Sequence, residues 1–177
     1  MPAIHILGAS GSGTSTLGKA LSERFNMHWI DTDNIVLEPT DPPFQVNRPV
    51  KERARLLDEA MRANPNCVVS GWLGDWGISF MPRFNLLIWL HTPTELRIER
   101  SKAREAAQFG ARILPGGDMY RNHQEFLDWA GRYDDGGMDI RSYAWQKEWL
   151  EQATCPVMEL DGSKQLDALV AEIAMML

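Results

Sequence analysis

A glycine-rich stretch near the N-terminus has the residue types and spacing of a phosphate-binding loop. Residues 8–16 read Gly-Ala-Ser-Gly-Ser-Gly-Thr-Ser-Thr and follow a short apolar run, Ile4–Leu7. Glycines let the backbone turn so that successive N–H groups point inward, and the N-terminus of a following helix adds partial positive charge. We therefore expect phosphate groups to bind here. The expected contacts are Gly8, Ser10, Gly11, Ser12, Gly13, Thr14, Ser15 and Thr16.

One position departs from the GxxxxGK[ST] pattern of such loops. The two glycines of the pattern and its final hydroxyl residue, Ser15, are present, but Thr14 stands where the pattern has lysine. The lysine ammonium normally reaches the outer phosphates and compensates charge as the bond breaks, whereas threonine donates only a neutral hydrogen bond. Ser15 keeps the hydroxyl that would bind Mg²⁺. Either another cation replaces the lysine, or turnover is weak.

Two aspartates follow the second apolar run, His28–Asp31. In a parallel α/β sheet the C-terminal ends of the strands line the ligand crevice, which would bring Asp31 and Asp33 beside the glycine-rich loop. We expect Asp31 to hold Mg²⁺ through water or to contact the substrate, and Asp33 to accept a proton from, or to orient, an acceptor hydroxyl or phosphate. A helix N-cap is the alternative role for such residues.

A dinucleotide-binding fingerprint, GxGxxG, can also be aligned on the loop. It uses Gly11 and Gly13, and an acidic pair lies about 20 residues on, but its third glycine falls on Thr16. The close helix packing that this glycine permits is then lost. A Rossmann oxidoreductase therefore stays a third hypothesis.

Candidates for holding a second substrate come from two further segments. Arg48 and Arg53, near the start of an expected helix, have the geometry to grip an anionic acceptor bidentately, although a solvated arginine is the commoner case. Gly71 and Trp72 end the third apolar run, Cys67–Ser70. They would give a flat or apolar substrate an aromatic wall with close backbone approach, or they belong to the core.

Positive charge is concentrated after the fourth apolar run, Leu86–Leu90. Five cations fall within residues 97–112, namely Arg97, Arg100, Lys102, Arg104 and Arg112. We expect Arg100, Arg104 and Arg112 to clamp a migrating phosphoryl group from a mobile lid, and so to replace the missing lysine. A salt-bridged helix face is the plain alternative.

The elements that position these residues alternate along the chain. The four apolar runs already named and a fifth, Pro156–Leu160, have the near-continuous apolarity of strands buried in a parallel sheet. Segments of helical period separate them. More than 50 residues lie between the fourth and fifth runs, more than a simple crossover needs. We therefore expect an α/β fold with an insertion at that point.

Composition limits the partners. The chain has 177 residues, of which 44% are hydrophobic, and a formal net charge of -6. This length suits one compact domain, and the acidic balance argues against nucleic acid and anionic membrane surfaces. No apolar run approaches the ~20 residues of a bilayer crossing, and two cysteines make no disulfide framework. We expect a cytoplasmic protein with small-molecule ligands, and the sequence leaves its oligomeric state open.

Taken together, the loop, the Asp31-x-Asp33 pair and the basic stretch 97–112 resemble the P-loop nucleoside and nucleotide kinase superfamily, in particular its adenylate kinase-like and shikimate kinase-like members. The resemblance covers most of the chain. It implies a three-layer α/β fold with a five-stranded parallel sheet in the order 2-3-1-4-5 and a helical lid insertion. It also implies ATP phosphates on Gly11–Thr16, Mg²⁺ at Ser15, and an acidic pair that serves the metal and the acceptor hydroxyl.

The same resemblance implies how the chain is divided. A single domain, 1–177, would hold an acceptor-binding region at 34–64 and a lid at 95–137. A closer likeness is to a bacterial group of adenylate kinase-like ATPases, whose membership names no substrate. It rests on the segments at 41–44, 70–77, 104–110 and 115–119, which read Asp-Pro-Pro-Phe, Ser-Gly-Trp-Leu-Gly-Asp-Trp-Gly, Arg-Glu-Ala-Ala-Gln-Phe-Gly and Pro-Gly-Gly-Asp-Met.

Two functions are compatible with these features. The first is a Mg²⁺-dependent phosphotransferase that moves the γ-phosphoryl group of ATP to a nucleoside, a nucleotide or a hydroxylated metabolite. Adenylate kinase activity in the strict sense is not expected, because the strand end Asp-Gly-x-Pro-Arg is absent at Gly71-Trp72. The second is a nucleotide-binding module with weak or no catalysis, in which Thr14 marks lost turnover and lid closure signals to a partner.

Overall fold

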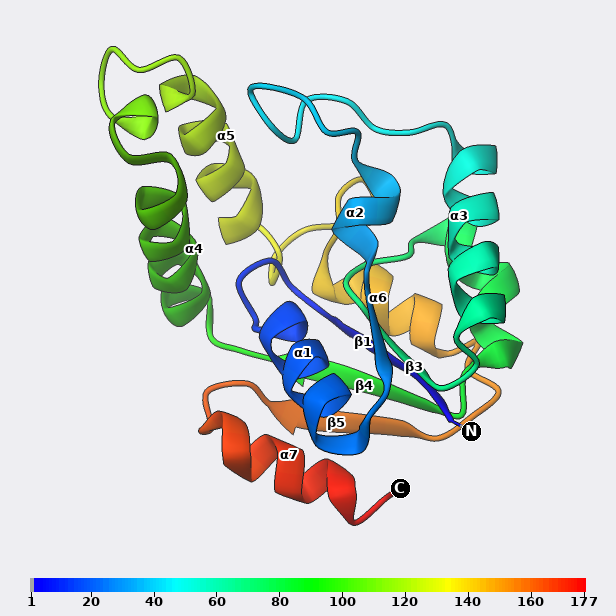
Figure 1. The fold of residues 1–177 in the computed structure, drawn as a ribbon. Coiled ribbons are helices and arrows are strands. Elements are labelled where there is room, and N and C mark those ends of the chain that lie inside the picture. The colour runs from blue at the N-terminus through cyan, green and yellow to red at the C-terminus, as the bar shows by residue number, and fades with distance from the viewer. Residues whose placement is uncertain (1) are drawn as a thin grey trace.

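A computed structural model describes residues 2–177 and shows a parallel sheet with helices on both faces (Figure 1). The five strands pair in parallel in the order β2-β3-β1-β4-β5, which confirms the expected fold and order. Each apolar run forms the strand predicted for it, within a residue or so at either end. The strands are β1 Ala3–Gly8, β2 His28–Asp31, β3 Cys67–Ser70, β4 Leu86–His91 and β5 Val157–Asp161.

The helices connect and cover these strands. Among the described residues, no helix combines the length and apolarity that a bilayer crossing demands. In chain order the helices are α1 Thr14–Phe25, α2 Thr32–Val36, α3 Val50–Ala63, the 3-10 helix η1 Asp75–Arg83, α4 Thr94–Phe109, the 3-10 helix η2 Gly110–Ile113, α5 Tyr120–Gly131, α6 Tyr143–Leu150 and α7 Leu166–Ala174.

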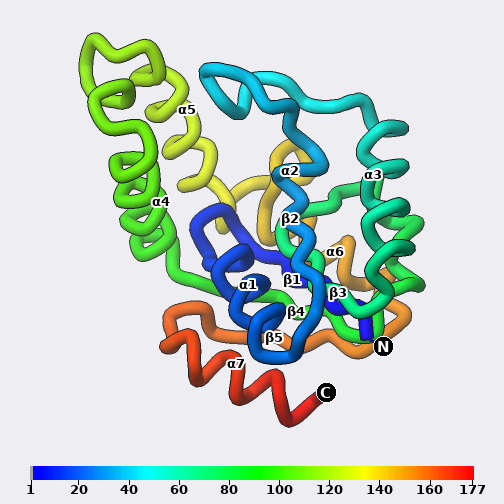
Figure 2. The backbone as a smooth tube through the Cα atoms, in the orientation of Figure 1, coloured from blue at the N-terminus to red at the C-terminus, as the bar shows by residue number. Residues whose placement is uncertain are grey.

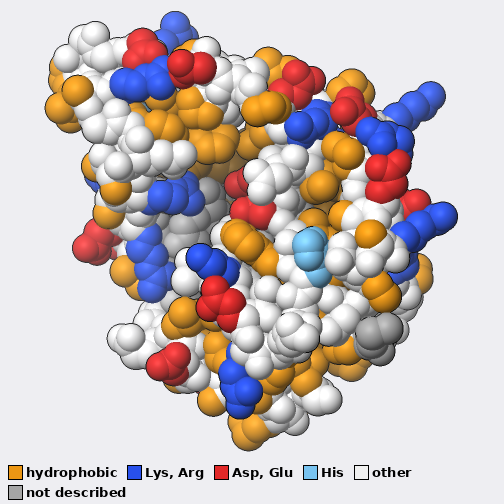
Figure 3. Space-filling view, viewed as in Figure 1, with side chains coloured by type: hydrophobic (Ala, Val, Ile, Leu, Met, Phe, Trp, Pro, Cys, Tyr) orange, Lys and Arg blue, Asp and Glu red, His pale blue; other side chains and the backbone are white. Residues whose placement is uncertain are grey.

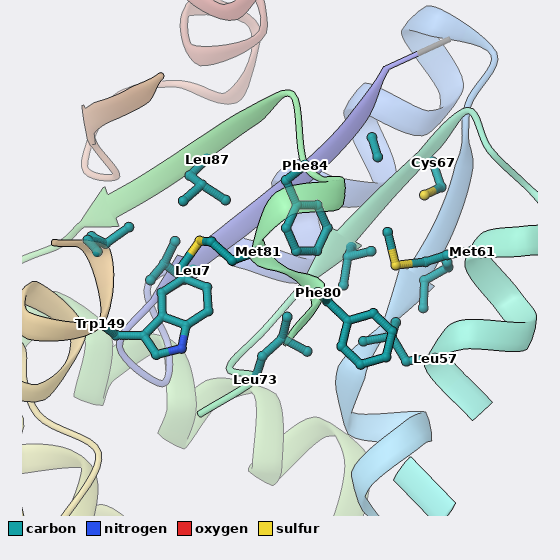
Figure 4. Packing of buried hydrophobic residues seen from close by; sticks show 14 of the residues in the cluster. Leu7, Leu57, Met61, Cys67, Leu73, Phe80, Met81, Phe84, Leu87 and Trp149 are labelled. Atoms are coloured by element: carbon teal, nitrogen blue, oxygen red, sulfur yellow. The ribbon is translucent and has the colours of Figure 1, made fainter. Parts of the chain in front are cut away.

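Two hydrophobic clusters, one on each face, fix the sheet between its helices. Successive strand side chains point to opposite faces, so in β1 Ile6 packs with α1 and α7 while Leu7 packs with α3, η1 and α6. Figure 4 shows this second cluster, in which Trp149 of α6 and Phe84 lie against the sheet. Because β1 is central and covered on both sides, the loop at its end starts from a rigid point.

Residues 94–131 project beyond the sheet as a pair of neighbouring helices, α4 and α5, joined through η2 (Figure 2). We call this pair the α4–α5 arm; it occupies most of the interval in which an insertion was expected. The proline-containing segment 37–49 extends from the other side, in the same direction as the arm (Figure 2). The two meet at their tips, where the Phe44 and Phe109 rings lie 6.2 Å apart and Arg112 forms an ion pair with Asp41 at 2.7 Å.

Candidate functional site

The glycine-rich loop connects the C-terminal end of β1 to α1 and turns sharply twice. Gly11 and Gly13 have φ of 78° and 101°, values in the left-handed region that favours glycine. The first also lies against the arm, because a Cβ added to Gly11 would sit 2.4 Å from the carbonyl oxygen of Arg97. The loop is therefore shaped both by its own glycines and by contact with α4.

The carbonyl groups of the loop are held from outside. The Gly8 carbonyl accepts hydrogen bonds from Gln146 Nε2, at 2.9 Å, and from Arg141 Nη2. Both donors belong to the chain that follows the arm, in or just before α6. The first turn of the loop is thus fixed by residues more than 130 positions away in the sequence.

Two more of these carbonyls are held by Thr92, Arg97 and Arg100, at the base of the arm, which we call its first stem. Ser12 O accepts from Thr92 Oγ1 at 3.1 Å and lies 3.4 Å from Arg100 Nη1, and Ser10 O lies 3.5 Å from Arg97 Nη1. The Thr14, Ser15 and Thr16 N–H groups have no helical acceptor, because they precede the first hydrogen bond of α1, from the Leu17 N–H to the Gly13 carbonyl at 2.9 Å. Such a set of free donors at a helix N-terminus is what an anion needs.

The acidic pair lies beside the loop, as the sheet topology predicts. Asp31 is half-buried at the end of β2, and its carboxylate accepts a hydrogen bond from the Asp33 N–H at 3.0 Å, so it N-caps the short helix α2. Burial raises the pKa of Asp31, and the Asp33 N–H, the Ser15 hydroxyl and the Arg104 guanidinium act against that rise. The structure thus places Asp31 beside Ser15, while Asp33 is exposed.

These residues fit a magnesium ion. Mg²⁺ takes oxygen ligands and usually keeps several waters, binding through one or two side chains plus substrate phosphates. The Ser15 hydroxyl and the Asp31 carboxylate supply such oxygens. No cluster of three or more His, Cys, Asp or Glu able to hold a metal occurs in residues 2–177, so the remaining ligands would have to come from phosphates and water.

The three arginines expected to clamp a phosphoryl group are separated by the structure. Arg100 reaches the loop and also donates to Gly162 O at 3.0 Å. Arg104 is exposed, on the side of α4 from which its charge acts on Asp31. Arg112 lies at the tip of the arm, where Asp118 and Asp41 pair with it and raise its pKa. Two of the three are therefore near the loop, and the third joins the arm to the segment 37–49.

Arg97 is a structural residue rather than part of an exposed helix face. Its side chain is completely buried. Its guanidinium donates to the carbonyls of Thr92 and Ala130, each at 3.0 Å, and to Asp134 at 3.2 Å. These contacts join the first stem to residues 130–134 at the end of α5, which form the second stem.

Arg48 and Arg53, the arginines expected to bind a second substrate, form hydrogen bonds within the protein. Arg48 donates to the carbonyls of Asn34, at 2.8 Å, and Leu37, and Arg53 Nε donates to Arg48 O at 2.6 Å. These bonds brace the segment that begins with α2. Arg48 Nη1 and Arg53 Nε are thus engaged by backbone oxygens, and Arg48 Nε lies 3.7 Å from the Glu52 carboxylate. Their role in binding a second substrate stays a prediction.

Gly71 and Trp72 follow β3, on the side of the sheet covered by α6. The Gly71 N–H bonds to the Ile6 carbonyl at 2.9 Å. Trp72 makes edge-on contacts with Trp145 and Trp149, at centroid distances of 5.7 and 5.5 Å. Trp72 is half-buried in this aromatic group, so it is both a core residue and a wall near the strand ends.

Sequence reasoning missed one charged residue at the loop. Arg141 lies between α5 and α6, outside the basic stretch, and contacts Gly8 as described above. Burial lowers its pKa, and the nearby Asp33 carboxylate raises it. No local motif marks Arg141, because its position depends on how the chain returns from the arm to the sheet.

Two cavities flank the loop. The first, which we call the α1 cavity, has a volume of about 280 Å³ and lies between the N-terminus of α1 and the chain after β5, with Thr16, Arg100 and Gly162 in its wall. The second has about 490 Å³ and lies beyond the ends of β4 and β5. Its lining includes Glu159 and Asp161 but neither lysine nor arginine, so only the first suits a ligand that carries phosphate.

The surface between the arm and the rest of the molecule is hollowed. Figure 3 shows Lys and Arg side chains on the arm beside this hollow and acidic side chains near its floor. These charges are on the sides expected from the positions of the acidic pair at the end of β2 and of the arginines on α4. A ligand with both phosphate and metal would meet opposite charges on the two walls.

Comparisons with known proteins show which family this chain belongs to. A family model described as AAA domain matches residues 4–113, from β1 through η2. The protein named Uncharacterized protein YqaC of Bacillus subtilis is 39% identical over 170 residues, which cover 96% of this chain and 94% of that protein. A cytidylate kinase of Methanococcoides burtonii is 25% identical over 126 residues, which cover 62% of this chain and 67% of that enzyme.

A solved structure agrees in fold. Shikimate kinase from Acinetobacter baumannii, in complex with shikimate, superposes with a TM-score of 0.61 and 17% sequence identity, covering 99% of this chain and 92% of that one. The strand order, the glycine-rich loop after β1 and the family match lead to the same assignment. The chain therefore belongs to the family described as AAA domain and to the P-loop nucleoside and nucleotide kinase-like superfamily.

Proposed function

We propose that this protein transfers the γ-phosphoryl group of ATP to a small acceptor that carries a hydroxyl or phosphate group. The observation that carries the proposal is the anion cradle of the glycine-rich loop. Its carbonyls are held outward by the arm and by residues next to α6, its helix N-terminal N–H groups are free, and two carboxylates lie beside it. The names of two relatives, cytidylate kinase and shikimate kinase, support the reaction class.

ATP would bind across the start of α1. Its phosphates would lie on the N–H groups of Gly11–Thr16, and its nucleoside would enter the α1 cavity, where the Arg100 guanidinium forms part of the wall. A planar guanidinium stacks well on an aromatic base. The α1 cavity lies on the opposite side of the loop from the acidic pair, so the γ-phosphate would point toward Asp31 and Asp33.

Mg²⁺, when bound, would neutralise phosphate charge and orient the outer phosphates. Ser15 and Asp31 are the residues that would hold it. Because Asp31 also N-caps α2, its carboxylate is fixed in direction before any ligand arrives. A fixed oxygen ligand favours one arrangement of the phosphates over others.

The acceptor would bind in the hollow between residues 34–64 and the α4–α5 arm, which would serve as a lid within one domain, 1–177. Asp33 is exposed, and it would orient the acceptor hydroxyl and take its proton. The acceptor oxygen forms a bond to the γ-phosphorus while the bond from that phosphorus to the β,γ-bridging oxygen breaks, and ADP leaves. Arg104 would compensate the charge on the moving group.

The test is ADP release with a panel of nucleosides, nucleotides, sugars and hydroxy acids, at fixed ATP and Mg²⁺, with mass detection of the phosphorylated product. Gly11→Ala is the inactive control, because its Cβ would meet the Arg97 carbonyl at 2.4 Å. At least one acceptor should raise ADP release well above the rate without acceptor. Background rates for the whole panel, with ATP binding intact, would refute the proposed reaction.

A second function, a nucleotide-binding module that signals to a partner, is favoured by one observation. Thr14 is buried at the position of the usual lysine and carries no charge. The substitution Thr14→Lys separates the two functions. A large rise in phosphoryl transfer without a change in nucleotide affinity would favour the binding module, whereas little change would favour a cation already acting in place of the lysine.

A further inference from the structure

Arg141 has a different environment from the other arginines near the loop. The chain between α5 and α6 brings it to the end of β1, where Nη2 donates to the Gly8 carbonyl. Gln146 donates to the same oxygen at 2.9 Å, so the carbonyl keeps a partner without the arginine. The position of the guanidinium is therefore not explained by a need to satisfy Gly8.

Most of the donors of Arg141 have no acceptor. A guanidinium has five N–H groups, and among residues 2–177 only the Gly8 oxygen accepts a hydrogen bond from this one, while Nε is buried without a partner. Asp33 influences Arg141 through its charge but forms no ion pair with it at contact distance. Arg141 as a whole is half-buried, but a donor such as Nε that is buried without an acceptor is unfavourable unless a ligand completes its hydrogen bonding.

Arg97 shows what a structural arginine looks like in this protein. It is fully buried, and its three nitrogens donate to three carbonyls, to the Thr94 hydroxyl and to Asp134. Its contacts are complete without a ligand. Arg141, which also contacts a carbonyl of the loop, has a single hydrogen bond to the protein, which indicates that its partner is a bound molecule.

The remaining arginines are less well placed to meet the outer phosphate. Arg100 donates to Gly162 on the side of the α1 cavity, and Arg112 is paired at the tip of the arm. Arg104 is exposed on α4. Arg141 alone among them combines contact with the first residue of the loop and closeness to Asp33.

We propose that Arg141 replaces the missing lysine by binding the γ-phosphate of the nucleotide beside Gly8 and Asp33. This inference rests on the proposed function, because it assigns a residue to the same site. In the transfer step the bond from the γ-phosphorus to the bridging oxygen breaks and the bond to the acceptor oxygen forms. The guanidinium stays protonated throughout and compensates charge on the non-bridging oxygens, while the acceptor proton passes to Asp33.

A binding experiment tests the proposal without turnover. Calorimetry would compare ADP with a non-hydrolysable ATP analogue, with Mg²⁺, in the wild type and in Arg141→Gln. Glutamine keeps an N–H donor for the Gly8 carbonyl but has no charge. We expect the affinity for the triphosphate to fall by about tenfold to a hundredfold, as for a lost charge-assisted hydrogen bond, with the affinity for ADP nearly unchanged.

The matched control is Arg132→Gln. Arg132 lies in the same segment, is exposed, and is 3.9 Å from Asp139 in a surface ion pair, so its substitution should leave both affinities at wild-type values. Rescue is the second test, since Thr14→Lys added to Arg141→Gln should restore the preference for the triphosphate. If Arg141→Gln does not fold, Arg141→Lys replaces it, and a folded lysine variant without preference for the triphosphate would contradict the role of the charge.

Two results would overturn the proposal. If Arg141→Gln binds both nucleotides like the wild type, the arginine does not touch the γ-phosphate. If it loses ADP and the triphosphate equally, the arginine shapes the loop through Gly8. Failure of the proposed function looks different, because the wild type would then phosphorylate no acceptor while Arg141 still set the preference between the two nucleotides.

Discussion

His5 makes the stability of this protein depend on pH in a way that can be calculated. It lies on β1, three residues before the glycine-rich loop, with no solvent exposure and no hydrogen-bond partner for either ring nitrogen among the described residues. Its ring lies 5.0 Å from that of Phe84 and 5.6 Å from that of Trp149. Burial lowers its pKa from 6.5 to about 3.

The direction in which the free energy of unfolding changes with pH follows from the pKa of His5 in the folded and in the unfolded protein. The folded protein keeps His5 neutral down to about pH 3, whereas the unfolded chain takes up a proton below about pH 6.5. Stability is therefore fully present above pH 6.5 and is lost as the pH falls toward 3. Each pH unit in this window corresponds to about 1.4 kcal/mol, so the free energy of unfolding should fall by about 2 kcal/mol between pH 7.5 and pH 5 from His5 alone.

The perturbation is His5→Leu, which has a similar volume and cannot be protonated. Urea unfolding of both proteins at pH 7.5 and pH 5 gives four free energies, and the difference of differences isolates His5 because all other titrating groups are shared. We expect the variant to lose about 2 kcal/mol less than the wild type. His28→Leu, which removes an exposed histidine from β2, controls for the change in histidine number. Equal losses in the wild type and His5→Leu would show that the buried ring is not held neutral.

Three further predictions test the site and its supports. Ser15→Ala should lower Mg²⁺-dependent phosphoryl transfer by at least about tenfold, since it removes a metal ligand. Lys19→Ala, further along α1 and exposed, should change the rate much less; both are read as initial rates against Mg²⁺ concentration. Arg97→Met should lower the free energy of unfolding by roughly 3–5 kcal/mol, because it breaks a buried network, while Arg121→Met on the exposed side of α5 should stay near the wild type in the same urea titration. Asp41→Asn removes a partner of Arg112 at the tip of the arm, so limited proteolysis should cut segment 37–49 faster with no change in the unfolding midpoint; equal cleavage rates would show that this ion pair does not restrain the segment.

The sheet and its loop could be predicted because local pattern determines them. Five apolar runs became five strands in the expected order, and the helix expected to start near Arg48 and Arg53 is present as α3, Val50–Ala63. Hydrophobic periodicity and glycine spacing act over a few residues, and a single sequence carries that information. The same holds for Asp31, whose role as an N-cap was one of the alternatives that its position allowed.

The roles of the arginines could not be predicted in this way. Arg97 falls on the same helical period as Arg100 and Arg104, yet it is buried because Ala130 and Asp134 supply its acceptors from the far stem of the arm. Arg141 reaches the loop from 133 residues away. Helical spacing gives the face of a side chain but not its partner, and the partner decides whether an arginine is structural or free to bind a ligand.

The hydrogen bonds that the loop carbonyls accept from the arm and from α6 limit where this protein can gain or lose residues during evolution. The groups that position Gly8, Ser10 and Ser12 lie in the stems of the arm and beside α6, whereas the tip around Pro115–Gly117 is exposed or half-buried and makes no such contact among the described residues. Insertions and deletions should therefore accumulate at the tip and be excluded from the stems. An arm transplanted from a relative would keep the loop in its present shape only if its stems brought equivalent donors to the same carbonyls.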